Sequence, residues 1–235
     1  SAVAAVALLA AAPLAFAQSS KQGGAATVTF NNDLTTLDPH VGYDWQNWSV
    51  IKSIFDGLMD YKPGTTDLEP DLAESYTVSD DGLTYTFKLR DGVKFHNGRV
   101  MTSADVKYSF ERAVNPATQS PGGGYFGMIS GYDDVAAGKA TMLNGIETPD
   151  DKTVIFKLSR PDATFLHLMA INFGYIVPKE DVEAAGADWG KKPVGTGAFK
   201  FVDWVPGQNI KLERNKDYFR AGVPFTYGWS NQQIK

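Results

Sequence analysis

The chain contains no cysteine among its 235 residues. This absence excludes zinc–thiolate sites, iron–sulfur clusters, cysteine nucleophiles and disulfides, so packing alone must hold the fold together. The chain also lacks an excess of positive charge, because 27 Asp and Glu residues outnumber 22 Lys and Arg residues and give a formal net charge of −5. This acidic balance, without a basic cluster, argues against nucleic acid and anionic membrane surfaces as partners.

Sequence motifs that mark catalysis or cofactor binding are also missing. The three histidines, His40, His96 and His167, lack metal-ligand spacing and are interpreted as structural or solvated. There is no G-x-S-x-G elbow, and the Gly-Thr-Gly at 195–197 lacks the third glycine of a dinucleotide fingerprint, so it is interpreted as a tight backbone turn. We therefore expect no enzymatic activity, no catalytic residue, no metal and no cofactor. The alternative function, that of a secreted hydrolase, would need a nucleophile–base pair.

The first 17 residues carry no charge and end in Ala15-Phe16-Ala17. An apolar stretch followed by an A-x-A site is typical of a secretory signal peptide, here without its basic n-region, and it is too short to span a bilayer. Because the cleavage site has no cysteine, we expect an exported, periplasmic protein that is not a lipoprotein.

The remaining residues contain enough apolar material for a sizeable core, since hydrophobic residues make up 43% and aromatic residues 12% of the chain. Alternating patterns predict strands, and helical spacing together with capping residues predicts helices. The expected strands lie at 27–30, 83–90, 154–158, 175–177, 199–201 and 210–212. The expected helices begin near 44, 102, 132, 161 and 179. This alternation indicates an α/β class.

Four segments, in this order, resemble the solute-binding protein family 5 of ABC importers. They are residues 68–98, 102–112 (TSADVKYSFER), 193–201 (PVGTGAFKF) and 213–219 (ERNKDYF). The resemblance implies a periplasmic-binding-protein type II-like fold, in which two lobes close on a ligand. It implies a discontinuous first lobe at 18–45 and 166–235, a family-specific subdomain inserted at 46–165, and a second lobe that is missing here.

The same resemblance implies a function in transport. The protein would be the N-terminal portion of a monomeric substrate-binding component, which captures peptide-like solutes and delivers them to the permease subunits of an ABC importer. Nickel complexes, oligosaccharides and opine-like solutes are alternative ligands. A purely structural or interaction protein, which needs no hinge, is an alternative of another class.

The resemblance also implies which residues would contact the ligand, because in this family the loop after the first strand and part of the inserted subdomain edge the cleft. The candidate ligand-binding residues are Asn32, Tyr43, Asp44, Trp45, Tyr125 and Asn172. Structural interpretations remain open for three of them. Trp45 would begin the buried face of the next helix, Tyr125 would be a core aromatic that anchors its loop, and Asn172 would belong to a strand-opening turn.

Overall fold

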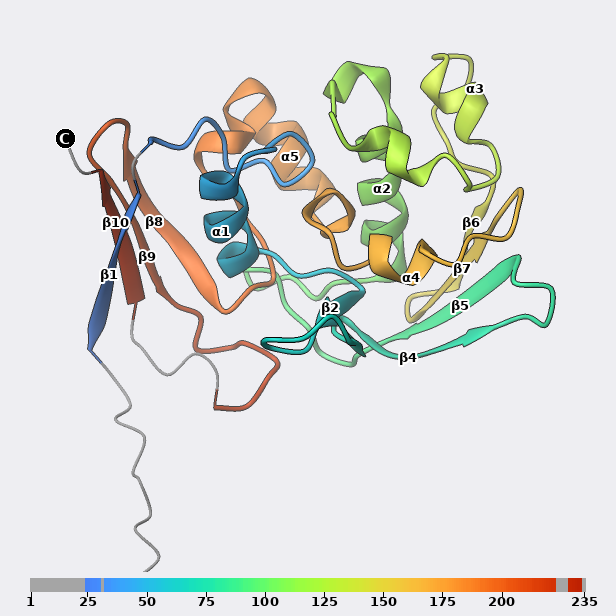
Figure 1. Ribbon diagram of the computed structural model, residues 1–235, viewed down its shortest axis with the longest axis horizontal. Coiled ribbons are helices and arrows are strands. Elements are labelled where there is room, and N and C mark those ends of the chain that lie inside the picture. The colour runs from blue at the N-terminus through green and yellow to red at the C-terminus, as the bar shows by residue number, and fades with distance from the viewer. Residues whose placement is uncertain (1–23, 31, 223–227, 234–235) are drawn as a thin grey trace, which may run out of the picture.

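Two four-stranded sheets lie at opposite ends of the molecule in the computed structural model, which describes residues 24–30, 32–222 and 228–233 (Figure 1). The expected signal peptide lies outside these residues. The first sheet has the order β1-β10-β9-β8, with β1 and β10 parallel and the other neighbours antiparallel. Its strands are β1 (Ala25–Phe30), β10 (Gly228–Gln233), β9 (Asn209–Arg214) and β8 (Phe199–Val205).

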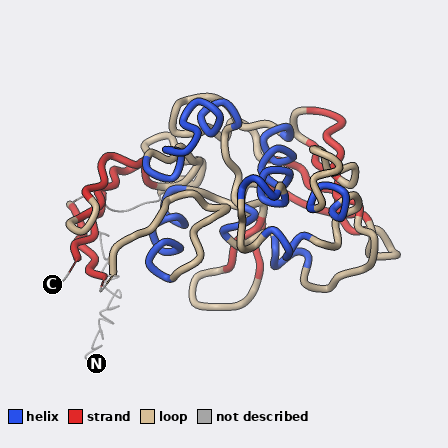
Figure 2. The backbone as a smooth tube through the Cα atoms, turned by 90° about the horizontal axis from the view of Figure 1, so that it is seen from above, coloured by secondary structure: helices blue, strands red, loops and turns tan. Residues whose placement is uncertain are grey.

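The second sheet is antiparallel, with the order β4-β5-β7-β6. Its strands are β4 (Ala73–Val78), β5 (Thr84–Leu89), β7 (Thr153–Lys157) and β6 (Ile146–Asp150), and a short hairpin pairs β2 (Met59–Tyr61) with β3 (Leu68–Pro70). The helices are α1 (Trp45–Ile54), α2 (Ser103–Val114), α3 (Tyr132–Ala136), α4 (Phe165–Leu168) and α5 (Lys179–Ala185). Figure 2 shows that helices and loops fill the space between the strands at the two ends.

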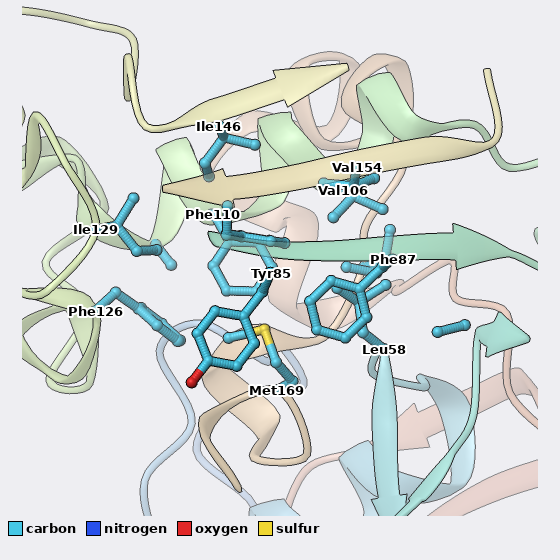
Figure 3. Close-up of a cluster of buried hydrophobic side chains, with 14 of the residues drawn as sticks. Leu58, Tyr85, Phe87, Val106, Phe110, Phe126, Ile129, Ile146, Val154 and Met169 are labelled. Carbon is cyan, nitrogen blue, oxygen red and sulfur yellow. The ribbon is translucent and has the colours of Figure 1, made fainter. Parts of the chain in front are cut away.

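The buried side chains form two clusters. The larger joins the second sheet to α2 and α4, and Figure 3 shows some of its side chains, among them Phe110 of α2 and Tyr85 and Phe87 of β5. The smaller joins α1 and α5 to the first sheet through residues such as Ile51 and Leu212. Within the described residues, no helix has the length and apolar character needed to cross a membrane.

The helix predicted from the capping box at 102–105 is confirmed. The Asp105 carboxylate accepts a hydrogen bond from the Thr102 backbone N–H at 2.8 Å, which satisfies a donor that the start of α2 leaves unpaired. Val106, Phe110, Ala113 and Val114 form the buried apolar face of α2, and Asn115 ends the helix as its C-cap. The strand predicted at 83–90 is also confirmed as β5, where Tyr85, Phe87 and Leu89 are buried.

Some predicted elements are wrong. Residues 175–177 form no strand, because the Ile176 N–H donates to the Asp56 carbonyl and the Val177 N–H donates to the Ser109 hydroxyl instead of to a neighbouring strand. The helix expected from 161 to 172 shortens to α4. The carbonyl of Met169, just after α4, accepts from the Met59 N–H of β2.

The sequence prediction also missed several strands. β3 and β4 lie in the segment 62–82, which is rich in Pro, Gly and Asp, and β6 and β10 were likewise not expected. β4 is an edge strand with Glu74, Ser75, Thr77 and Val78 exposed, so most of its positions show no apolar alternation.

Candidate functional site

Five aromatic side chains gather on one side of α1, and we call Tyr43, Trp45, Trp48, Tyr125 and Phe173 the aromatic cluster. Tyr43 stacks on Phe173 with ring centroids 6.1 Å apart, and Tyr125 meets the same ring at 6.0 Å. The ring centroid of Trp48 lies 5.9 Å from that of Tyr43, 6.1 Å from that of Trp45 and 6.3 Å from that of Phe173. These contacts join three segments that are far apart in the sequence.

The aromatic cluster borders a hollow of about 350 Å³. The hollow is lined by Trp48, Lys52, Tyr61, Tyr125, Leu168, Ala170, Ile171, Asn172, Phe173 and Tyr175. Phe173 is buried, whereas Tyr43, Trp45 and Tyr125 are 57%, 81% and 46% exposed. An apolar, partly open hollow with exposed aromatic rings is the kind of surface that binds small molecules in proteins.

The backbone under the aromatic cluster is held by two of the polar candidates. Asp44 caps α1, because its Oδ1 accepts from the Asn47 N–H at 3.0 Å. The Asn172 amide is buried and donates to the carbonyls of Pro39 and Gly42 at 2.9 and 3.0 Å. The Trp48 indole N–H donates to the same Gly42 carbonyl at 2.9 Å, so this loop and α1 fix the orientation of the Trp48 ring.

The structure therefore brings Tyr43, Trp45 and Tyr125 together but gives the other candidates different places. Asp44 and Asn172 support the backbone, although Asn172 also lines the hollow. Asn32 is exposed just after β1 and is not part of the lining. The interpretation of Trp45 as the start of a buried face is wrong, because α1 buries Asn47, Val50, Ile51 and Ile54 instead.

Sequence reasoning missed Trp48 and Phe173 as site residues. Trp48 begins the helical spacing that continues with Ile51, which is typical of a buried face, but it is only half-buried and lines the hollow. Phe173 follows Asn172 in a 3-10 turn, Asn172–Gly174, and forms the base on which Tyr43 and Tyr125 pack. The only sequence signal for Phe173 as a site residue is that it directly follows the candidate Asn172.

A buried ionic cluster locks the loop that carries Tyr43. Arg112 of α2 donates to both carboxylate oxygens of Asp38, at 2.9 and 2.5 Å, and to His40 Nδ1 at 2.8 Å. Because Nδ1 accepts, the proton lies on Nε2, which donates to the Tyr175 carbonyl at 3.0 Å. Burial, with the neighbouring Arg112 charge, lowers the pKa of His40 to about 4. His40 is thus a neutral structural residue.

The Gly-Thr-Gly turn at 195–197 packs directly on the end of α1. The Gly197 N–H donates to the Ile54 carbonyl at 2.8 Å, and the Thr196 hydroxyl donates to Asp56 at 2.7 Å. Burial raises the pKa of Asp56 to about 6, although hydrogen bonds from Thr196 and Tyr218 oppose this shift. The close packing agrees with the prediction of a tight backbone turn.

Two further features bear on what the site can bind. A groove of about 1340 Å³ lies between the loop after β1, the 3-10 turn Gly186–Lys191 and β8. Its lining mixes apolar and charged side chains, and two of the charged ones, Arg112 and Asp38, are paired with each other. Across residues 24–30, 32–222 and 228–233, no group of three or more His, Cys, Asp or Glu side chains could hold a metal ion.

The chain is similar to several known proteins. It is 33% identical over 199 residues to the glutathione-binding protein GsiB of Pectobacterium atrosepticum, a match that covers 85% of this chain and 36% of GsiB. It is 36% identical over 189 residues to di/tripeptide-binding protein 4 of Pseudomonas aeruginosa, with 74% of this chain and 34% of that protein covered. The chain thus spans about a third of the length of the curated relatives that it matches.

The fold is shared with Haemophilus influenzae OppA, solved in complex with the peptide RPPGFSPFR. The TM-score is 0.84 at 26% identity, and the match covers 90% of this chain and 42% of OppA. This similarity confirms an α/β fold of the periplasmic-binding-protein kind. Residues 67–228 match the model of bacterial extracellular solute-binding proteins, family 5 (middle). With its fold and more than half of its residues matched, the chain belongs to the bacterial extracellular solute-binding proteins of family 5.

Proposed function

We propose that this chain serves an ABC importer as its extracytoplasmic substrate-binding component, capturing peptide-like solutes and delivering them to a membrane permease. The observation that carries the proposal is the partly exposed aromatic cluster beside an apolar hollow. Flat rings at a surface offer apolar contact area to the side chains of a peptide without fixing their chemistry. The relatives named above as binding glutathione, dipeptides or tripeptides, and an oligopeptide support the same class of solute.

The proposal includes the division into lobes. Residues 18–45 and 166–235 would form lobe I around the smaller buried cluster, and residues 46–165 would form the inserted subdomain around the larger one. The two buried clusters follow this division only in part, because α1 packs in the smaller cluster, whereas Met169, Phe173 and Ile176 pack in the larger one. The additional length of the relatives would supply a second lobe that closes over the hollow, and closure would be stabilised by contacts that the bound solute adds.

The proposed setting is the periplasm, with the protein acting as a soluble monomer that is not a lipoprotein. Two relatives of known structure, MppA and DppA from Helicobacter pylori, are described as periplasmic binding proteins. Capture involves no chemical step, so the solute leaves unchanged and the protein is not an enzyme.

Removing the exposed rings tests this function. We expect the double variant Tyr43→Ala/Tyr125→Ala to bind the tripeptide Ala-Phe-Ala at least about tenfold more weakly, because Tyr125 lines the hollow and Tyr43 packs on its Phe173 wall. Isothermal titration calorimetry on the mature protein, as the cell makes it, provides the measurement. Both side chains are about half exposed, so the variant should keep its fold.

The matched control is Met142→Ala, which removes an exposed apolar side chain that does not line the hollow. Its affinity for Ala-Phe-Ala should equal that of the unaltered protein. Equal affinities for the double variant and the unaltered protein would show that the solute binds elsewhere.

A further inference from the structure

The lining of the hollow is almost entirely apolar or aromatic. Among the described residues that line it, Lys52 is the one with a charged side chain. The hydroxyl of Tyr61 is engaged with His167 Nδ1 at 3.0 Å, and the Asn172 amide is engaged with two backbone carbonyls. The hollow therefore presents few free polar groups to a solute.

The charge of Lys52 is balanced locally. Its Nζ lies 2.5 Å from Oδ1 of Asp60, and this carboxylate also accepts from the Tyr61 backbone N–H at 2.8 Å. The side chains are 53% and 24% exposed, so the pair lies at the rim and not in the interior. Asp60 belongs to β2 and does not line the hollow, which means that it holds the ammonium from outside.

Other charged groups lie behind this rim. Asp56 and Asp71 are buried, and Arg220 donates to Asp71 at 2.6 Å and to Glu69 at 3.0 Å. None of these four residues lines the hollow, and their charged groups are paired with one another or hydrogen-bonded within the protein. At the rim itself, Lys52 and Asp60 form the charged pair that a solute meets, and their charges cancel.

On the basis of the proposed function, we propose that the hollow selects solutes by inserting one uncharged aromatic or bulky apolar side chain. The Lys52–Asp60 pair is the specificity determinant that keeps this rim neutral. A volume of about 350 Å³ is at the small end of ligand pockets, so it suits a single side chain of a peptide and leaves the charged peptide termini outside. Charged side chains are disfavoured, because burying an unpaired charge against apolar walls is costly.

The test compares five tripeptides that differ only at the central residue: Ala-Phe-Ala, Ala-Leu-Ala, Ala-Ala-Ala, Ala-Asp-Ala and Ala-Lys-Ala. Affinities are measured by calorimetry on the mature protein. We expect Ala-Phe-Ala to bind at least about tenfold more tightly than Ala-Ala-Ala, since a whole apolar side chain is transferred from water. Ala-Leu-Ala should fall between them, and the two charged peptides should bind no better than Ala-Ala-Ala.

Two reciprocal variants then test the rim pair. Asp60→Asn keeps an oxygen that can accept from the Tyr61 N–H but frees the Lys52 ammonium, so binding of Ala-Asp-Ala should strengthen about threefold to fivefold. Lys52→Met leaves Asp60 unpaired, so binding of Ala-Lys-Ala should strengthen by a similar factor. The control Asp188→Asn breaks a surface pair with Lys191, away from the hollow, and should change neither affinity.

The outcomes separate this inference from the function on which it rests. Tight binding of Ala-Asp-Ala or Ala-Lys-Ala by the unaltered protein, or no reciprocal change in the two variants, would overturn the selection rule while peptide capture stands. If none of the five tripeptides binds, the proposed function itself fails and the selection rule falls with it.

Discussion

Replacing Gly195 by alanine is expected to lower the free energy of unfolding by about 3 kcal/mol or more. A Cβ at this position would lie 2.1 Å from the Ile54 carbonyl oxygen and 2.8 Å from the Phe55 ring. Both distances are far inside van der Waals contact, and the first neighbour is backbone at the end of α1. Neither α1 nor the turn can shift freely, because the Gly197 N–H and the Thr196 hydroxyl tie them together.

Urea denaturation followed by circular dichroism measures this effect. Gly124→Ala is the matched control, because an added Cβ there would meet only the Tyr132 hydroxyl, at 3.8 Å. The control should change the free energy of unfolding by no more than about 0.5 kcal/mol. Similar stabilities for the two variants would mean that the turn does not pack against α1 as closely as described.

Replacing Arg112 by methionine is expected to lower the free energy of unfolding by about 3–5 kcal/mol at neutral pH. Arg112 is the buried partner of the Asp38 carboxylate, with side-chain exposures of 15% and 9%, and it also donates to His40. Methionine keeps much of the apolar stem but leaves the Asp38 carboxylate without its cation. The loop that carries Tyr43 would then lose its attachment to α2.

The pH dependence of this variant has a definite sign. In the unaltered protein the pKa of His40 is about 4, below its usual value near 6.5, so its contribution to stability is present above about pH 6.5 and is lost as pH falls toward 4. Without Arg112, the pKa of His40 rises toward its usual value, because one cause that lowers it is removed while Asp38 remains. The destabilisation should therefore be largest near neutral pH and shrink as pH falls.

Urea denaturation at about pH 7 and about pH 4.5 measures both the size of the destabilisation and the direction in which it changes with pH. Arg160→Met, at an exposed arginine, serves as the control and should cost no more than about 0.5 kcal/mol at either pH. If Arg112→Met lost little free energy of unfolding, or lost more of it as the pH falls, the role given to the Arg112–Asp38–His40 cluster would be contradicted.

Local sequence signals predicted the parts of the fold that depend on nearby residues. The capping residues at 102 and 105 determine where α2 begins, and the alternation of Tyr85, Phe87 and Leu89 reflects a strand with one buried face. Strands that expose most of their residues, such as β4, carry no such signal. Residues 175–177 are apolar because they are buried, but their backbone is satisfied by Asp56 and Ser109 and not by a strand.

The candidate site could be predicted only in part for a related reason. Tyr43 and Trp45 lie close together in sequence, but the approach of Tyr125 and Phe173 depends on tertiary packing between distant segments. Asp44 and Asn172 are candidate ligand contacts through the family resemblance, and this stays a prediction. Asp44 also supports the site as the N-cap of α1, and Asn172 supports it through long-range hydrogen bonds to backbone carbonyls, which no sequence pattern reveals.

The most direct test of the account is to locate a bound solute in the mature protein. A crystal structure determined with Ala-Phe-Ala should place the phenyl ring in the hollow, against Trp48, Tyr125 and Phe173, with both peptide termini outside it. A phenyl ring bound instead in the groove between the loop after β1 and β8 would contradict the central claim that the aromatic cluster is where this protein captures its solute.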